Sequence, residues 1–387
     1  MLARTGMRRA LVLSSVLLAL GVPFAVGYRL SAASRVDRPV AIPDVVDQVR
    51  EALAAHYYRP VPPEVLGLGS VHKIISALGD PYTAYLAPST YKLVRDETAS
   101  TYSGIGVSLL PSARGFVVVS TIRPGPAARA GVRVGDTIVR IGDAPAKHLS
   151  MSAGLASILG PQGTTVQLGV QRGRRNMTFD VRRGIVHAPV VEGRLISYAG
   201  KRWGVLRLSS FRVGAAVVLG RELHRLQREG ARGFVLDLRQ NPGGLLEQAI
   251  AVSSLFLSKG VVVSLASAHG PREVFHAARG LATTAPLVVL VDRYSASSAE
   301  IVAAALRDNH RATIVGEHTY GKALVQSIDP LPNGAALEMT IAHYTTPAGT
   351  DISGVGVDPQ IHAVDDPRTS QDEALTTALR VLARPTS

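Results

Sequence analysis

From Trp203 onward the chain alternates short apolar runs with amphipathic stretches of helical spacing. The run FVLDLR at 234–239 is almost continuously apolar, which suits a strand that is buried on both faces of a sheet. The stretch at 214–230 instead places its apolar residues on one helical face, and the stretch at 298–309 is predicted to be a further helix. Strands that alternate with helices predict an α/β core with helices on both faces of the sheet. The same patterns predict a helix from about Leu245 and strands at 203–211, 286–292, 312–317, 323–332 and 334–347.

The stretch at 99–185 has a different pattern, with short strands separated by glycine-containing turns and a predicted helix at 150–159. In this order the segments resemble a PDZ domain, a mostly β fold that binds the last residues of another chain as an added strand. The resemblance implies that the substrate's terminal carboxylate is captured by backbone N–H groups of the run Gly104-Ile105-Gly106-Val107. The alternative is that these four residues form only a β-turn.

The segments on either side of this insertion complete the domain plan. Two predicted helices make residues 44–98 an N-terminal helical region, and Gly79 is expected to end the second of them before a turn. Residues 186–367 hold the α/β core. Residues 368–387 hold a final helix that is expected to start at a capping box from Ser370 to Glu373.

Residues 1–27 have the pattern of a targeting or anchoring segment. Basic residues, including Arg8 and Arg9, precede an apolar run at 10–27. Its 18 residues would span ~27 Å as a helix, close to the ~30 Å hydrocarbon core of a bilayer. The segment is predicted to be a signal peptide or a membrane anchor, followed by a linker at 28–43. We expect the remaining chain to be exported to the bacterial periplasm or the outer face of the inner membrane. A buried core helix is the alternative.

Composition excludes several classes of function. The chain has no cysteine, which removes disulfides, thiolate nucleophiles and cysteine metal sites together. Its formal net charge is +13, but no nucleic-acid motif and few aromatic residues accompany that charge, so no nucleic-acid partner is expected. The basic side chains gathered at 172–202 are expected to be solvated charge on strands and loops. Contact with an anionic membrane surface is the alternative.

A serine and a lysine offer a nucleophile and a base. Ser297 lies in the segment VDRYSASSAE, and Lys322 follows it in VGEHTYGKALVQ. A lysine with an ordinary pKa near 10.4 is almost entirely protonated at pH 7, so Lys322 can accept a proton only if burial lowers its pKa to roughly 7–8. Ser297 also begins a capping-box pattern with Glu300, so a purely structural role as a helix cap is the alternative.

These segments, together with FVLDLRQNPGGLL at 234–246, resemble the carboxyl-terminal processing (tail-specific) proteases, which are PDZ-containing enzymes with a serine–lysine dyad. The resemblance extends from about Asp44 to Pro359. It implies a serine endopeptidase that cleaves protein substrates near their C-terminus, with Ser297 as the nucleophile and Lys322 as the general base.

The same resemblance assigns further roles. Gln326 would orient the lysine amine. The oxyanion hole would consist of the backbone N–H of Gly243 or Gly244 together with that of Ser298. Asp237 and Arg239, at the end of the buried strand, are expected to form a structural ion pair.

Two departures from the family pattern affect these expectations. The order Ser298-Ala299 is the reverse of the usual family order, which makes Ser295 and Ser298 rival nucleophiles. Leu159 stands where relatives often have an arginine that ties the PDZ domain to the active site, so the coupling between the two must differ here. The alternative function is a PDZ-based adaptor with a silent core, or a protease that awaits an activating partner.

Other chemistries are not expected. The segment from Gly316 to Lys322 has P-loop spacing, but Ala323 follows it where magnesium binding requires Ser or Thr. The histidines show no H-E-x-x-H pattern and no close pairing along the sequence, so neither a metal nor a cofactor is expected. The expected partners are proteins or peptides with exposed C-termini, an activating adaptor and a second copy of the chain. Light scattering that shows a monomeric or polydisperse mature chain would exclude the homodimer.

Overall fold

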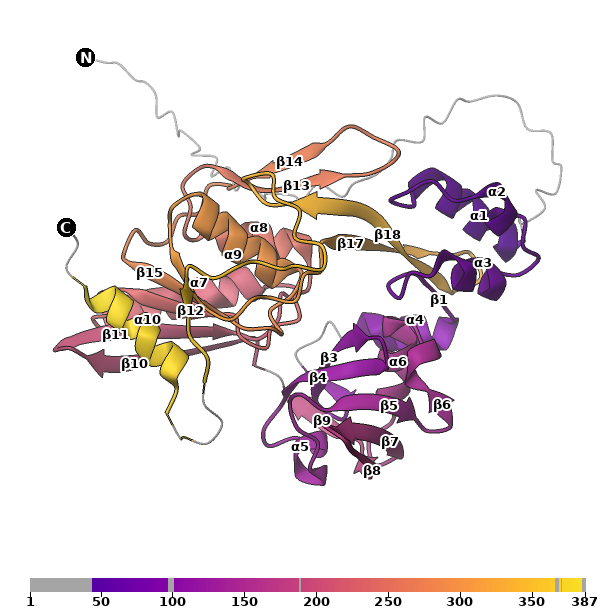
Figure 1. The fold of residues 1–387 in the computed structure, drawn as a ribbon, viewed down its shortest axis with the longest axis horizontal. Helices are drawn as coiled ribbons and strands as arrows, with labels where there is room; N and C mark the ends of the chain where they lie inside the picture. The colour runs from indigo at the N-terminus through magenta and orange to yellow at the C-terminus, as the bar shows by residue number, and fades with distance from the viewer. Residues whose placement is uncertain (1–43, 97–100, 188, 366–368, 370, 385–387) are drawn as a thin grey trace, which may run out of the picture. The chain divides into compact units, whose positions relative to one another are not determined.

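The computed structural model describes residues 44–96, 101–187, 189–365, 369 and 371–384 (Figure 1). The expected targeting segment at 1–27 and linker at 28–43 lie outside the described residues. No helix in the described ranges is both long and apolar enough to cross a membrane. The unit from Pro43 to Ser387 contains all the elements below.

A six-stranded sheet forms the centre of the core, as the alternating pattern predicts. Strands β11, β12, β15, β16 and β19 are parallel, and β10 joins β11 as an antiparallel edge strand. The strand order along the sheet is β10 (Val191–Tyr198), β11 (Lys201–Leu208), β12 (Phe234–Asp237), β15 (Leu287–Val291), β16 (Thr313–Gly316) and β19 (Ile361–His362).

Helices cover both faces of this sheet. Helices α7 (Ala215–Arg228), α8 (Leu246–Ser254) and α9 (Ser298–Asp308) pack on one face, and α10 (Glu373–Ala383) packs on the other (Figure 1). Alternate residues of one strand serve the two faces, since Leu236 contributes to the first cluster and Val235 to the second. The predicted α/β core is confirmed.

A second sheet links the N-terminal region to the core. Its strands are β1 (Ala84–Leu86), β18 (Ala336–Thr345), β13 (Val261–Ala266) and β14 (Glu273–His276), with β17 (Leu324–Pro330) also paired to β18. Helices α1 (Val45–His56) and α3 (Val71–Leu78) bury apolar side chains against Leu337 and Met339 of β18, and the short α2 (Pro63–Leu66) lies between them in sequence. Gly79 ends α3 with φ +65°, as expected for a left-handed C-cap.

The stretch between α4 (Pro88–Asp96) and β10 forms an inserted β domain, as predicted. Its sheet has the order β3 (Val107–Ser112), β4 (Gly115–Thr121), β5 (Thr137–Ile141), β7 (Thr165–Arg172) and β8 (Arg175–Arg182), with β6 (Ala144–Pro145) paired to β5. Helices α5 (Pro126–Ala130) and α6 (Met151–Ile158) and the 3₁₀ turn Ala146–His148 complete it. Strands β2 (Thr101–Gly104) and β9 (Gly184–His187) pair where the chain enters and leaves the domain.

The predicted ion pair at the end of β12 is part of a larger network. Arg239 donates to Asp237, Asp365 and Asp372 at 2.7–2.9 Å. Asp372 also accepts the N–H of Leu375, so Asp372 is the N-cap of α10, in place of the capping box expected to begin at Ser370. The arginine holds Asp372 in that position, an influence that local sequence does not reveal.

Candidate active site

Ser297 lies at the turn between β15 and α9. Its backbone has φ +54°, a conformation that non-glycine residues seldom adopt and that often marks functional sites. The serine is partly exposed, and its hydroxyl donates to no acceptor among the described residues. The turn therefore presents an available hydroxyl at the N-terminus of a helix, where the backbone dipoles favour negative charge.

The two rival serines are both engaged in structural hydrogen bonds. Ser295 is fully buried and donates to the carbonyl oxygen of Leu238 at 2.8 Å. Ser298 is 1% exposed and donates to the carbonyl oxygen of Gly244 at 2.8 Å. Of the three hydroxyls, only that of Ser297 is both accessible and free to donate.

The turn at Asn241–Gly244 packs directly against the serine. Asn241 is fully buried, and its side chain donates to the Leu208 carbonyl oxygen at 2.8 Å and accepts the Gly243 N–H at 2.9 Å. A Cβ atom added to Gly243 would lie 2.8 Å from the Cβ atom of Ser297, so only glycine permits this approach.

This geometry refines the expected oxyanion hole. The Gly243 N–H already has a partner in Asn241, which argues against it as an oxyanion donor. The N–H groups of Gly244 and Ser298 have no acceptor among the described residues. The pair that remains available is therefore Gly244 with Ser298.

Glu300 joins the serine turn to the lysine segment. It is fully buried, and its two carboxylate oxygens accept four hydrogen bonds at 2.5–2.9 Å. The four donors are the N–H groups of Ser297, Gly321 and Lys322 and the hydroxyl of Thr319. Burial raises the pKa of Glu300 to about 7, although the four donors oppose this shift. One carboxylate thus fixes the backbones of Ser297 and Lys322 side by side.

Lys322 is half-buried, and its amine lies in the desolvated environment that a lysine base requires. Burial lowers its pKa to about 8, and the neighbouring carboxylates of Glu338, Asp80 and Glu300 limit the shift. Its Nζ atom lies 4.2 Å from the centroid of the Tyr82 ring. Near pH 8 a large fraction of this lysine is a neutral amine that can accept a proton.

Gln326 forms its side-chain hydrogen bond away from the lysine. Its side-chain Nε2 donates to Thr340 Oγ1 at 3.5 Å, across the β17–β18 pair. No hydrogen bond joins Gln326 to Lys322 within the described ranges. The orienting role expected for Gln326 therefore has no support in this conformation.

Hydrogen bonds join the inserted domain to groups beside the lysine. The Tyr320 hydroxyl, two residues before Lys322, donates to the carbonyl oxygen of Pro111 in β3 at 2.6 Å. Ser152 in α6 donates to the carboxylate of Glu338, which is one of the charges acting on Lys322. Sequence reasoning missed both contacts, because their partners are far apart in the chain.

The expected peptide-binding run covers the last residue of β2, the connection at Ile105 and Gly106, and the first residue of β3. Gly106 has φ +75°, and the carbonyl oxygens of Ile105 and Gly106 accept the N–H groups of Ala127 and Ile122 at 2.8 and 2.9 Å. Strand β3, which begins at Val107, is an edge strand of its sheet. The edge needed for an added strand is therefore present.

Leu159, the residue that replaces the arginine of relatives, is 5% exposed beside this run. A Cβ atom added to Gly104 would lie 3.0 Å from the Leu159 side chain, so the two residues are in close contact. Leu159 therefore packs against the peptide-binding run and makes no charged contact.

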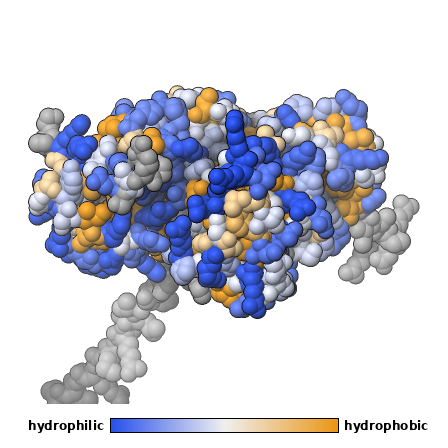
Figure 2. Space-filling view, turned by 60° about the horizontal axis from the view of Figure 1, so that its bottom comes forward, coloured by the Kyte–Doolittle hydropathy of each residue, from blue (hydrophilic) through white to orange (hydrophobic). Residues whose placement is uncertain are grey.

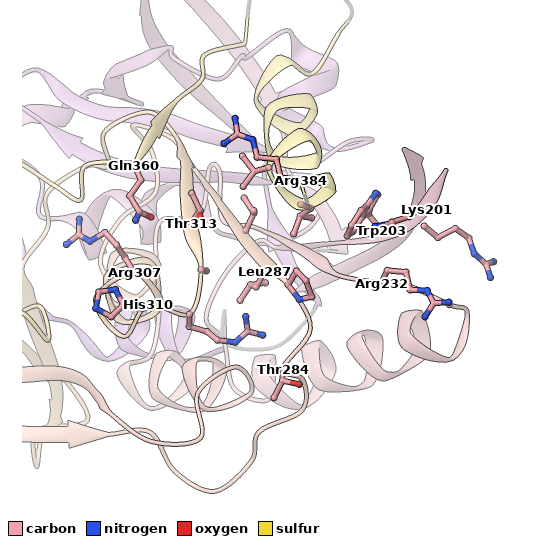
Figure 3. Close-up of a pocket in the computed structure, with 18 of the residues that line it drawn as sticks. Lys201, Trp203, Arg232, Thr284, Leu287, Arg307, His310, Thr313, Gln360 and Arg384 are labelled. Carbon is pink, nitrogen blue, oxygen red and sulfur yellow. The ribbon is translucent and has the colours of Figure 1, made fainter. Parts of the chain in front are cut away.

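A large cavity lies elsewhere on the core. It has a volume of about 1390 Å³, and its lining includes Trp203 and none of the expected site residues (Figure 3). Its basic lining residues are Lys201, Arg202, Arg232, Arg307, Arg311 and Arg384. On the face drawn in Figure 2, hydrophobic residues form separate patches among hydrophilic ones.

The sequence of this chain matches two known protein families. Residues 202–363 match peptidase family S41, and residues 103–182 match the PDZ domain family. The chain is 34% identical to the chloroplastic carboxyl-terminal-processing peptidase 2 of Arabidopsis thaliana, over 80% of this chain and 63% of that protein. It is 35% identical to the carboxyl-terminal-processing protease of Picosynechococcus sp., over 75% of this chain and 71% of that protein.

A solved structure supports the same assignment. The photosystem II D1 C-terminal processing protease matches with a TM-score of 0.72 and 27% identity, over 88% of this chain and 96% of that chain. This likeness includes the inserted domain as well as the core. The chain therefore belongs to the carboxyl-terminal-processing proteases of peptidase family S41, which are serine-type peptidases, and it carries an inserted PDZ domain.

Proposed function

We propose that this protein is a serine endopeptidase that cleaves protein substrates near their C-terminus, with Ser297 as the nucleophile and Lys322 as the general base. The observation that carries the proposal is the shared carboxylate of Glu300. It holds the available hydroxyl of Ser297 and the buried amine of Lys322 on adjoining backbone segments. Since the hydroxyls of Ser295 and Ser298 already donate to backbone carbonyl oxygens, Ser297 is the remaining candidate nucleophile.

The proposed reaction follows from these positions. Ser297 Oγ attacks the substrate carbonyl carbon while the neutral Lys322 amine takes the hydroxyl proton. The N–H groups of Gly244 and Ser298 stabilise the negative charge that develops on the carbonyl oxygen. Lys322 then gives its proton to the leaving amine as the C–N bond breaks, and water hydrolyses the acyl-enzyme by the same route. No step requires a metal or a nucleotide.

The PDZ domain would hold the tail of the substrate. An apolar C-terminal tail would extend the sheet along β3, with its carboxylate beside Gly106. The contacts through Tyr320 and Ser152 would let an occupied domain influence the lysine segment. They would replace the arginine coupling that Leu159 removes. An activating partner would act on the same contacts.

We further propose that the protein works after export, at or near the outer face of the inner membrane. The basic start and the apolar run at 10–27 support this location. N-terminal sequencing of the protein recovered from the cell envelope would distinguish a cleaved signal peptide from a retained anchor. Recovery of the protein only from the cytosol would contradict export.

Removal of the substrate's terminal charge tests tail capture. A reporter that ends in Leu-Ala-Ala with a free carboxylate is compared with the same reporter amidated at its C-terminus. We expect kcat/KM to fall by roughly 10- to 100-fold on amidation, because a charge-assisted hydrogen bond contributes ~1.5–3 kcal/mol.

Gly106→Ala is the test variant for the binding run, and Gly142→Ala is its matched control. Both positions have positive φ and lie in the PDZ domain, but only Gly106 is in the binding run. Discrimination against the amide should shrink in the Gly106 variant alone. Equal cleavage of both reporters by the unaltered protein would contradict tail capture while leaving the dyad intact.

A further inference from the structure

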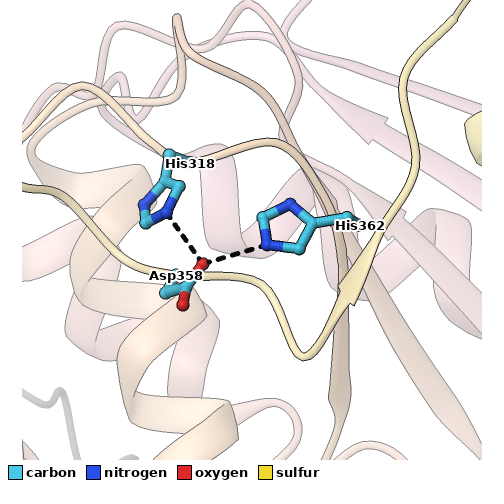
Figure 4. Close-up of side chains that lie close together, drawn as sticks. All are labelled: His318, Asp358 and His362. Carbon is cyan, nitrogen blue, oxygen red and sulfur yellow. Dashed lines mark ion pairs between the residues drawn. The ribbon is translucent and has the colours of Figure 1, made fainter.

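Three side chains that could bind a metal ion lie close together on the surface of the core, outside the serine site. His318 lies between β16 and β17, Asp358 precedes β19, and His362 belongs to β19 (Figure 4). Strands β16 and β19 are adjacent and parallel, with Gly316 opposite His362. This pairing brings together two histidines that are distant in the sequence. The two histidines are therefore neighbours in the fold, although the sequence gives no sign of this.

The distances between the ligand atoms suit a small metal ion. The Nε2 atoms of His318 and His362 lie 3.0 and 3.4 Å from the same oxygen, Oδ1 of Asp358. All three candidate ligand atoms lie within 4.8 Å of one another. A tetrahedral zinc ion with bonds of ~2.0–2.2 Å separates its ligand atoms by roughly 3.3–3.6 Å. Small side-chain rotations would bring the two nitrogen atoms to that separation.

We propose that His318, Asp358 and His362 form a binding site for a divalent transition-metal ion, with zinc as the ion that fits best. Two imidazole nitrogens and one carboxylate oxygen are ligands that zinc prefers, whereas calcium and magnesium prefer sites made of oxygen atoms. All three side chains are exposed, at 58–64% of their surface, so water completes the coordination.

The site adjoins the segment that presents the catalytic lysine. His318 is followed by Thr319, whose hydroxyl donates to Glu300 at 2.5 Å. Val357, next to Asp358, donates to the same hydroxyl oxygen at 2.7 Å. A bound ion would therefore hold the outer end of the segment whose inner end is held by Glu300. The ion acts on the mobility of this segment and takes no part in the chemistry of Ser297.

Zinc binding to the full-length protein tests the proposal. The protein is purified in mild detergent, its affinity tag is removed, and chelator-treated samples are titrated calorimetrically with zinc chloride at pH 7.5. We expect about one ion per chain. His318→Gln, Asp358→Asn and His362→Gln should each weaken binding at least tenfold, because each removes one ligand.

The matched control is His224→Gln, which alters an exposed histidine that forms a hydrogen bond with Gln227 of its own helix. It should leave the affinity unchanged. Affinity should also fall as the pH is lowered from 7.5 to 5.5, since protons compete with the metal for imidazole nitrogen. If the three residues form only histidine–aspartate ion pairs, the titration should show no zinc binding.

Hydrogen exchange provides a second readout that does not depend on peptidase activity. Zinc should slow amide exchange in residues 317–320 of the unaltered protein but not of His362→Gln. The proposal is overturned if zinc does not bind, or if binding and protection are the same in the three ligand variants as in the unaltered protein. Because neither readout requires cleavage, these outcomes are independent of the proposed dyad.

Discussion

Replacement of Glu300 by alanine is expected to lower the free energy of unfolding by about 3–5 kcal/mol and to remove peptidase activity. The substitution leaves four donors without their acceptor: the N–H groups of Ser297, Gly321 and Lys322 and the hydroxyl of Thr319. A buried donor without a partner costs ~1–3 kcal/mol, and local rearrangement recovers part of the sum. The serine turn and the lysine segment would lose the group that joins them.

Urea unfolding and reporter cleavage check this prediction at pH 8, above the pKa of about 7 that burial gives Glu300. Glu317→Gln is the matched control. Glu317 lies in the segment that leads to Lys322, and its carboxylate forms an ion pair with the exposed Arg293. The control should change stability by less than ~1 kcal/mol and keep its activity. Full activity in Glu300→Ala would show that the shared carboxylate is not what positions the site.

Lys322→Met is expected to abolish cleavage while it stabilises the folded protein. Burial lowers the pKa of Lys322 from 10.5 to about 8, which corresponds to a cost of about 3 kcal/mol for the charged form at pH 7. Methionine has a similar length and carries no charge to desolvate. Since the substitution also removes the contact with the Tyr82 ring, the expected net gain is about 1–3 kcal/mol.

The gain should depend on pH in a defined direction. Between about pH 8 and 10.5 the unfolded chain keeps a proton on this lysine that the folded protein has lost, so the unaltered protein gains stability as the pH rises through this window. The advantage of Lys322→Met should therefore shrink over the same range.

Lys259→Met, at an exposed position, serves as the control and should give no such gain. If Lys322→Met is destabilising at pH 7 and its effect is independent of pH, the lysine is not held in the environment described above.

The core could be predicted from sequence because its signals are local. Continuous apolar runs identify β12 and β15, helical spacing identifies α7, and the capping-box pattern at Ser297 identifies the start of α9. The serine and lysine segments, together with the run at 234–246, carried the resemblance to the family. The β13–β14 hairpin was not predicted, because β14 pairs with β13, and β13 in turn pairs with the distant β18.

The parts of the site that sequence did not reveal depend on long-range contacts. Tyr82 reaches Lys322 only because β1 pairs with β18 and places the preceding turn beside the lysine. The sequence predicts Glu300 only as half of a capping box. The fold adds three further hydrogen-bond donors to its carboxylate. The partner of the Gly243 N–H is likewise visible only in three dimensions.

The most direct test of the account is cleavage of an unfolded reporter ending in Leu-Ala-Ala by the full-length protein and by its Ser297→Ala and Ser298→Ala variants. We predict cleavage by the unaltered protein and a loss of at least about a thousandfold in Ser297→Ala, with the fold intact by circular dichroism. Ser298→Ala should retain cleavage, because only its backbone N–H is assigned a role. Cleavage that survives in Ser297→Ala and disappears in Ser298→Ala would contradict the assignment of the nucleophile. Tail binding without cleavage by any form would favour an adaptor or a protease that awaits its activator.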